Sequence, residues 1–221
     1  MLRFTNYIGR KFIGLIACVG VIGNVSAETQ TWNLSDAALK ACVEKLAAKQ
    51  RWHSIADVTE IRCHSQGIKS LRGLESFKAL QKLSLHNNDI SEIELSAWPL
   101  LTSLTISENK LQAVTIDGLA NLQDVFLFRN RIQTLQLINL PQLKRIKANG
   151  NGMTSFTYQG LGALEKIYLF DNQLEHMDIY NLPALDYMDV RQNPMPDELY
   201  EEMDRLNGVT ILHDGNEEDW Q

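Results

Sequence analysis

The stretch LQDVFLFRNRI, from Leu122 to Ile132, carries the pattern that decides the fold of this chain. Apolar residues occupy its first, fourth, sixth and eleventh positions, and asparagine occupies its ninth. A pattern that recurs along the chain at a fixed period of about 20 to 50 residues predicts a solenoid of stacked repeats. The pattern returns every 21 residues, with its asparagines at Asn88, Asn109, Asn130, Asn151, Asn172 and Asn193.

The spacing within each repeat predicts a short strand followed by a turn. Apolar side chains two residues apart lie on one face of a strand, so the residues between them point to water. An asparagine at the turn can satisfy backbone groups there through its amide, and stacked copies would form a ladder of buried amides. One repeat cannot bury its own apolar face, so the repeats must stack on one another.

These residues resemble the leucine-rich repeat family over roughly Val58 to Leu206. A degenerate first copy reads Val58, Ile61, Cys63, Gln66 and Ile68, in which Gln replaces Asn and Cys replaces a strand Leu. The resemblance to the short 21-residue bacterial type implies a β-rich leucine-rich repeat solenoid. It implies parallel strands on one face and short second strands or irregular coil on the other. The second apolar pairs are Ile93 and Leu95, Val114 and Ile116, Leu135 and Leu137, Phe156 and Tyr158, and Met177 and Ile179.

The chain before the repeats contains two predicted segments. Residues 1–27 are typical of an export signal, because basic residues precede an apolar run that ends in Val25-Ser26-Ala27. A lipoprotein signal acylated at Cys18 is the alternative. Residues 28–57 predict a helical cap, in which Ser35 begins a helix that continues through Ala47.

The end of the chain predicts a second cap. Asp197 can begin a helix from Glu198 to Leu206, which closes the repeat region 58–206. Residues 207–221 then predict a strand followed by an acidic tail. We therefore expect helical caps at both ends of the solenoid, which would cover its open apolar ends.

Charge and cysteine content restrict the class of protein. Removal of residues 1–27 would take away three of 21 basic residues and none of 27 acidic residues, which leaves a net charge of −9. This balance disfavours nucleic acid and anionic membranes as partners. We expect a secreted or periplasmic monomer with no stable membrane insertion after signal cleavage. Export also favours a disulfide between Cys42 and Cys63 over two buried free thiols.

No motif in the sequence points to catalysis, a cofactor or a structural metal. Phosphate loops, nucleophile elbows and paired-cysteine metal motifs are missing, so we predict a protein that is not an enzyme. His64 and His86 occupy the same outward position in adjacent repeats, close enough to share a metal ion. Surface coincidence is the favoured interpretation of this pair, because no third ligand is evident.

The outward strand positions give the best candidate site. From the third asparagine-bearing repeat onward they gather aromatic and basic residues, which are types enriched at protein interfaces. The alternative is that the aromatic residues stabilise the sheet by packing across neighbouring strands. The predicted ligand-binding residues are Phe126, Phe128, Arg129, Arg145, Lys147, Lys166, Tyr168, Phe170 and Tyr187.

The resemblance implies a non-enzymatic, exported module that binds another protein through its regular strand face. The alternative is a surface protein that binds a glycan or an anionic polymer through the same residues. An enzyme is the third hypothesis, since some bacterial leucine-rich repeat effectors carry a ubiquitin-ligase domain with a catalytic cysteine. Neither Cys42 nor Cys63 has a histidine base predicted beside it in a cleft.

Overall fold

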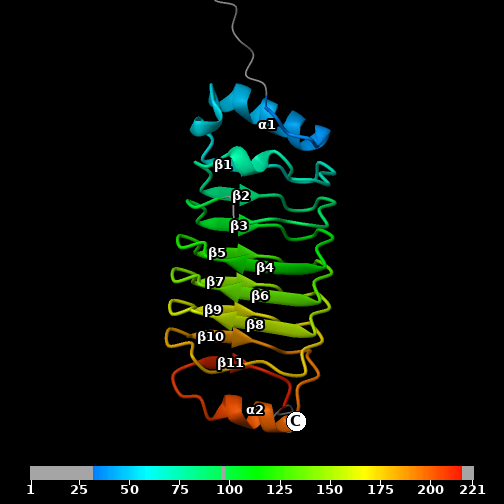
Figure 1. Cartoon of the computed structure of the whole chain (residues 1–221). Helices are drawn as coiled ribbons and strands as arrows, with labels where there is room; N and C mark the ends of the chain where they lie inside the picture. The colour runs from blue at the N-terminus through cyan, green and yellow to red at the C-terminus, as the bar shows by residue number, and fades with distance from the viewer. Residues whose placement is uncertain (1–31, 96–97, 216–221) are drawn as a thin grey trace, which may run out of the picture.

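The computed structural model describes residues 32–95 and 98–215 of the chain. These residues form an elongated solenoid whose coils stack along one axis, with one helix at each end (Figure 1). The predicted export signal, its alternative at Cys18 and the last residues of the acidic tail lie outside the described part. The division of the chain at residues 27, 57 and 206 stays a prediction.

The larger sheet contains one short strand from each coil, in chain order and all parallel. This sheet confirms the predicted parallel face. Its eight strands are β1 (Glu60–Arg62), β2 (Lys82–Ser84), β3 (Ser103–Thr105), β5 (Asp124–Phe126), β7 (Arg145–Lys147), β9 (Lys166–Tyr168), β10 (Tyr187–Asp189) and β11 (Thr210–Leu212).

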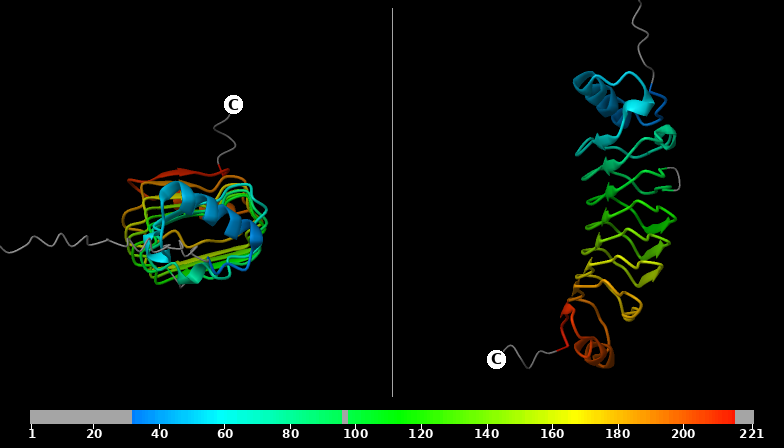
Figure 2. Two further views of the ribbon diagram at one scale, coloured as in Figure 1. Left: turned by 90° about the horizontal axis from the view of Figure 1, so that it is seen from above. Right: turned by 90° about the vertical axis from the view of Figure 1, so that its left-hand side faces the viewer.

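A second, three-stranded parallel sheet lies on the other side of the coils (Figure 2). It confirms the expected second strands for three of the five apolar pairs. The residues of the pairs at Ile93 and Met177 lie in coil instead. Near Met177, the Tyr158 hydroxyl donates a hydrogen bond to the Asp178 carbonyl at 3.1 Å. A side chain therefore occupies the carbonyl that would accept a backbone hydrogen bond from the neighbouring strand. The strands are β4 (Ala113–Asp117), β6 (Thr134–Ile138) and β8 (Ser155–Gln159).

The core runs as a continuous apolar column between the two sheets. In the larger sheet Leu104, Val125, Ile146 and Ile167 are register partners in successive strands, and all four are fully buried. Burial of such a side chain stabilises the fold by about 1.5–3 kcal/mol. The degenerate first repeat joins this column, because Ile61 is also fully buried.

The six repeat asparagines form the predicted ladder of amides. Asn172 is 2% exposed, and its Oδ1 accepts a hydrogen bond from the backbone N–H of Met153, in the preceding coil, at 3.1 Å. Its Nδ2 donates to the carbonyl oxygens of Ala148 at 3.1 Å and Leu169 at 2.8 Å. The amide therefore joins the turn of its own coil to the coil before it. Asn88, Asn109, Asn130, Asn151 and Asn193 repeat this arrangement.

The residue before each repeat asparagine has left-handed backbone geometry, which the sequence did not reveal. Five of the six are not glycine, and a positive φ is uncommon for such residues. The turn therefore imposes the same conformation on chemically different side chains. The residues are Asn87, Glu108, Arg129, Gly150, Asp171 and Gln192, with φ between 54° and 64°.

Helix α1 (Ala37–Gln50) lies across the N-terminal end of the solenoid and buries Leu39, Val43 and Ala47. The prediction that Ser35 begins this helix is wrong. Asp36 is the N-cap, and its carboxylate accepts hydrogen bonds from the backbone N–H groups of Leu39 and of Lys69 and Ser70 in the first repeat. A carboxylate that anchors both the helix and the first coil explains the difference. Two 3-10 helices, Ile55–Asp57 and Leu74–Ser76, follow.

Helix α2 (Asp197–Asp204) lies at the other end. The prediction that Asp197 caps it is also wrong, because the helix includes Asp197 and its N-cap is Pro196, which makes no side-chain capping bond. Tyr200 instead links the helix to the last repeat, since its hydroxyl donates to the Asn193 carbonyl at 2.8 Å. The role of α1 and α2 as caps stays a prediction.

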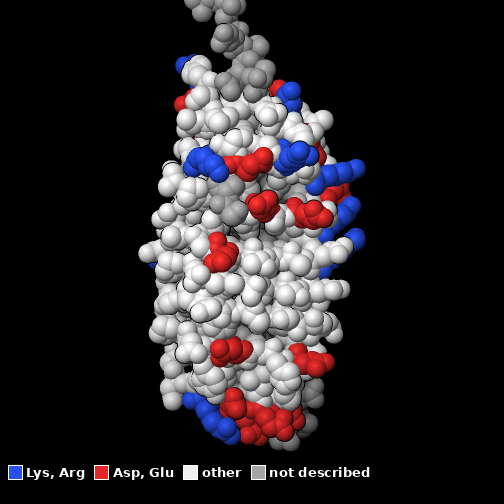
Figure 3. Space-filling model, in the orientation of Figure 1, with Lys and Arg blue, Asp and Glu red and all other residues white. Residues whose placement is uncertain are grey.

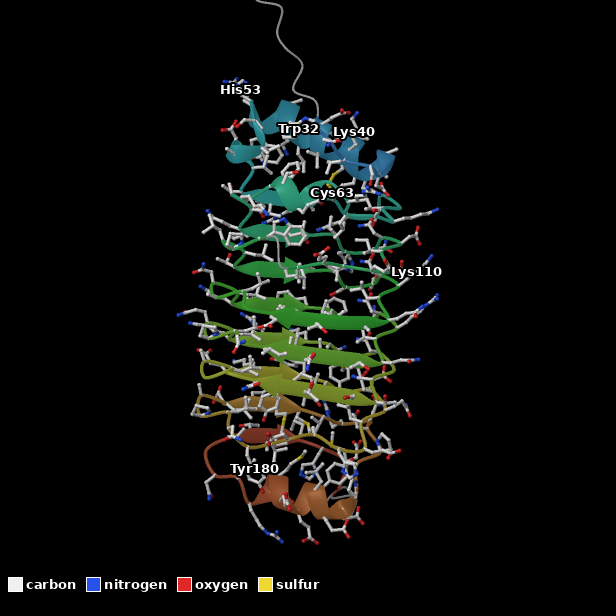
Figure 4. All side chains as sticks on the ribbon, viewed as in Figure 1. Trp32, Lys40, His53, Cys63, Lys110 and Tyr180 are labelled. Carbon is white, nitrogen blue, oxygen red and sulfur yellow. A yellow bond between two sulfur atoms is a disulfide. The ribbon has the colours of Figure 1, made fainter. Side chains whose placement is uncertain are left out.

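The disulfide between Cys42 and Cys63 is present and links α1 to the first repeat. Figure 4 shows Cys63 directly below the helix. Cys63 is 1% exposed, so the bond lies at the edge of the core. This pairing confirms the disulfide and excludes two free thiols as the arrangement of these residues.

We predict that Asn130→Ala lowers the free energy of unfolding by about 1–3 kcal/mol, because it leaves buried backbone groups without a partner. The lost contacts are those to Leu111 N–H at 3.1 Å and to the carbonyls of Ile106 at 2.9 Å and Leu127 at 3.0 Å. Urea unfolding followed by circular dichroism measures the change. Asn149→Ala is the control, since Asn149 occupies an outward position. Equal stability of the two variants would contradict the amide ladder.

We predict that reduction of the Cys42–Cys63 disulfide lowers stability by about 3 kcal/mol, the loop-closure value for a loop of this length. Thermal melting with and without dithiothreitol measures the shift. The double variant Cys42→Ala/Cys63→Ala controls for direct effects of the reductant. A wild-type melting temperature that does not respond to reductant would show that the bond contributes nothing to the fold.

Candidate binding face

The predicted ligand-binding residues lie together on the outward side of the larger sheet. Register places Phe126, Lys147 and Tyr168 in one row and Arg145, Lys166 and Tyr187 in a second row. Phe128 and Phe170 follow two residues after the first row. Together with Arg129, these nine residues are called the binding face below. Each of their side chains is exposed or half-buried.

The aromatic rings of the binding face are half-buried because they contact their neighbours. The rings of Tyr168 and Tyr187 lie 5.2 Å apart between centroids. Lys147 places its Nζ 4.6 Å from the Tyr168 ring, and the Arg145 guanidinium lies 5.9 Å from the Phe126 ring. Cross-strand packing, the alternative interpretation, therefore does operate here. It covers part of each ring and leaves the rest open to a ligand.

The charges of the binding face are only partly neutralised. Arg145 forms an ion pair with Asp124 at 3.1 Å, and Arg129 forms one with Glu108 at 3.0 Å. Within the described part of the chain, Lys147 and Lys166 have no carboxylate partner at ion-pair distance. Two cations that lack acidic partners therefore flank the Tyr168 ring.

The C-terminal limit of the face is an ion pair between a buried aspartate, Asp189, and an exposed arginine, Arg191. Asp189 occupies an outward strand position but is only 3% exposed, contrary to expectation. Arg191 covers it, with Nε and Nη2 donating to the two carboxylate oxygens at 2.9 and 2.7 Å. Burial, followed by the negative charge of Asp189, raises the pKa of the neighbouring Tyr187. Tyr187 thus keeps its phenolic proton at neutral pH and can donate a hydrogen bond.

His64 and His86 lie at the N-terminal end of the same sheet, with ring centroids 5.9 Å apart. The two residues are called the histidine pair below. His64 Nε2 lies 2.7 Å from Ser84 Oγ, and His86 Nε2 lies 3.6 Å from a carboxylate oxygen of Glu108. Burial, then His86 and Arg62, lowers the pKa of His64.

The hydrogen bond between Ser84 and His64 resembles half of a nucleophile and base arrangement. A catalytic histidine also needs a group that orients its second nitrogen. The nearest carboxylate in its own strand, Glu60, instead pairs with Arg62. Among the described residues, no side chain therefore orients the second nitrogen of His64. The contact between Ser84 and His64 offers no support for an acyl-transfer site.

Two open hollows lie outside the binding face. The larger, about 630 Å³, lies between the first two coils beside Arg72, Glu92 and Trp98. The smaller, about 520 Å³, lies beside α1 against Trp32 and Trp52. None of the aromatic and basic residues of the binding face lines either hollow.

In Figure 3 the face that contains the three-stranded sheet is largely uncharged across its centre.

As the side chains stand, no group of three or more His, Cys, Asp or Glu in residues 32–95 and 98–215 can hold a metal ion. No helix in the same residues is long and apolar enough to span a membrane.

Comparison with known proteins identifies similar folds. No protein-family model and no curated protein sequence matches the chain. Among solved structures, internalin C2 from Listeria monocytogenes is 20% identical, with a TM-score of 0.54, over 82% of this chain and 94% of the internalin. An internalin, InlF, from the same organism is 16% identical, with a TM-score of 0.42, over 81% and 75% of the two chains.

A third structure, the functional domain of InlJ from Listeria monocytogenes, is 17% identical with a TM-score of 0.35. That alignment covers 74% of this chain and 55% of the InlJ domain. At these identities the likeness concerns the fold alone, and of the three structures only internalin C2 has a TM-score above 0.5. The parallel coils of 21 residues, the amide ladder and this likeness agree, and the chain has the leucine-rich repeat fold.

Proposed function

We propose that the protein is a non-enzymatic module that binds another protein through the binding face. The observation that supports this most is the concentration of five aromatic and four basic side chains on one stretch of an otherwise regular sheet. A repeat scaffold does not require this concentration. Equivalent outward positions in the earlier strands carry Ser84 and Thr105.

The chemistry of the face suits a protein partner. Tyrosine, phenylalanine and arginine are enriched at interfaces. The rigid aromatic rings bury a large area at a low cost in side-chain entropy. Paired strands carry the rings of Phe126, Tyr168 and Tyr187, and those of Phe128 and Phe170 lie two residues beyond the ends of β5 and β9. Cross-strand contacts bury part of each ring, and a partner that covers the face would bury the apolar surface that is still exposed.

The unpaired lysines define the partner further. Lys147 and Lys166 would gain most from carboxylates, so the partner should present acidic side chains beside an apolar patch. An anionic polymer, such as an acidic glycan, is the second candidate because the same two lysines would attract it. The two candidates differ in their need for the rings, since a flexible polyanion binds mainly through charge.

We propose that the protein is exported and acts as a monomer in the periplasm or outside the cell. The Cys42–Cys63 disulfide supports an oxidising compartment. The signal-like residues 1–27 support export on sequence grounds. Fractionation of the source cells tests the compartment, and light scattering of the purified protein tests the oligomeric state.

We predict that Phe128→Ser/Phe170→Ser weakens partner binding by more than about tenfold, because interface aromatic residues often contribute 2 kcal/mol or more each. Capture from envelope extract and culture medium, with identification by mass spectrometry, would supply the partner, and calorimetry would measure the affinity. Thr115→Ala/Thr157→Ala on the three-stranded sheet is the control. Loss of folding without a selective loss of binding would favour the sheet-packing interpretation instead.

We predict that wild-type binding weakens as salt rises and that Lys147→Glu/Lys166→Glu abolishes capture of an acidic protein partner. Lys40→Glu/Lys45→Glu on α1 changes the net charge equally and should leave binding intact. A set of binding curves at increasing salt measures both effects. If Lys147→Glu/Lys166→Glu prevents binding but Phe128→Ser/Phe170→Ser does not, the ligand is an anionic polymer.

A further inference from the structure

The histidine pair is the part of the strand face that the proposed function does not use. Hydrogen bonds hold the backbones of its two coils in register, from Cys63 N–H to the Ser84 carbonyl at 2.9 Å and from Ser65 N–H to the His86 carbonyl at 3.1 Å. His64 and His86 therefore stand side by side on adjacent coils, which are about 4.8 Å apart in such sheets. Both side chains are open to solvent at least in part.

The position of the His86 ring is restrained from the other side. Its centroid lies 6.1 Å from that of Phe128, although the coil of Ser107 separates their coils. Ser107 is fully buried between them, and its hydroxyl is a buried side-chain oxygen without a hydrogen-bond partner in the described part of the chain. The two rings thus close over the small serine, which leaves the other side of His86 facing His64.

The spacing of the polar atoms fits a shared metal ion. Two ligands of a tetrahedral zinc ion lie about 3.3 Å apart, given bond lengths near 2.0–2.1 Å. The 3.6 Å between His86 Nε2 and the Glu108 carboxylate approaches this value. Two imidazoles on one such ion place their ring centres about 5 Å apart. The 5.9 Å of the histidine pair exceeds this by an amount that rotation of surface side chains can remove.

The competing contacts at this position are weak ones to solvent-accessible groups. His64 would have to release the Ser84 hydroxyl, and Glu108 would have to share its carboxylate with Arg129. Arg62, the other nearby cation, is already paired with Glu60. Since three ligands do not converge as the side chains stand, binding would begin with the two imidazoles, and water would complete the coordination.

We propose that His64 and His86 bind one divalent transition-metal ion of the zinc, nickel or copper class. Imidazole nitrogen suits these ions and disfavours magnesium and calcium. Glu108 is a third ligand that the ion can draw in, and Ser84 lies close enough to His64 to orient a bound water. This site is separate from the proposed protein-binding function and does not depend on it.

Isothermal titration with zinc chloride and with nickel chloride tests the site on the purified full chain without a polyhistidine tag. We expect saturable binding of one ion per chain and no binding of magnesium. His64→Gln and His86→Gln should each weaken binding by more than about tenfold, since even the partners of metal ligands contribute this much. Glu108→Gln should weaken it less.

The control variants are His53→Gln and His176→Gln, which change exposed histidines elsewhere; Figure 4 labels His53 near α1, at the N-terminal end of the solenoid. Both should bind zinc as the wild type does. Absence of saturable binding, or binding that His64→Gln and His86→Gln leave unchanged, would overturn the proposal. An equal loss in the control variants would overturn it as well.

A measurement on the wild-type chain covers the case in which the variants do not fold. Diethyl pyrocarbonate modifies accessible neutral histidines, and mass spectrometry locates the modified residues. Zinc should protect His64 and His86 and leave His53 reactive. Equal modification of His64 and His86 with and without zinc would contradict the site.

Discussion

The asparagine amide at each turn, buried in four repeats and half-buried at Asn130 and Asn151, is the interaction on which the rest of the structure depends. Its oxygen accepts from the preceding coil, and its nitrogen donates to carbonyls of both coils, as at Asn172. Buried backbone groups must be paired, and the carbonyls that the Asn172 amide contacts belong to Ala148 and Leu169, which are fully buried. The amide supplies these bonds at a fixed interval, so it sets the distance and register between coils. Each outward side chain is then aligned with its equivalents in the neighbouring strands.

This alignment explains why the binding face is a property of the whole stack. Phe126, Lys147 and Tyr168 come from separate repeats, and each repeat contributes one residue to the row. A change of one residue in the period would turn outward side chains into the core. The face can therefore vary in sequence only at the outward positions, while the inward residues and the asparagines stay fixed. The aromatic and basic residues of the binding face occupy such outward positions. Nearer the N-terminus one row continues through Thr105, Ser84 and Arg62, and the other through Asp124, Ser103 and Lys82.

The sequence predicted the features that recur in every repeat. It did not predict features that depend on one contact between residues distant in the chain. The parallel sheet, the amide ladder and the outward rows follow from the period alone. The sequence predicted Ser35 as the cap of α1, but serine and aspartate have similar N-cap preferences, and the bonds of Asp36 to Lys69 and Ser70 favour Asp36. The left-handed backbone conformation before each asparagine could not be predicted from residue type. Glutamate, arginine and glycine all adopt it, as at Glu108, Arg129 and Gly150. Burial of Asp189 depends on Arg191 in the same turn, and no rule of strand alternation predicts it.

The central claim is that the partner docks on the larger sheet at the binding face, and site-specific crosslinking tests it most directly. A photoreactive benzoylphenylalanine would replace Phe170 in one variant and Thr115, on the opposite sheet, in another. Both proteins would be irradiated in envelope extract and in culture medium. We predict one discrete crosslinked protein from position 170 and none from position 115. The same adducts from both positions, or an adduct only from position 115, would contradict the account.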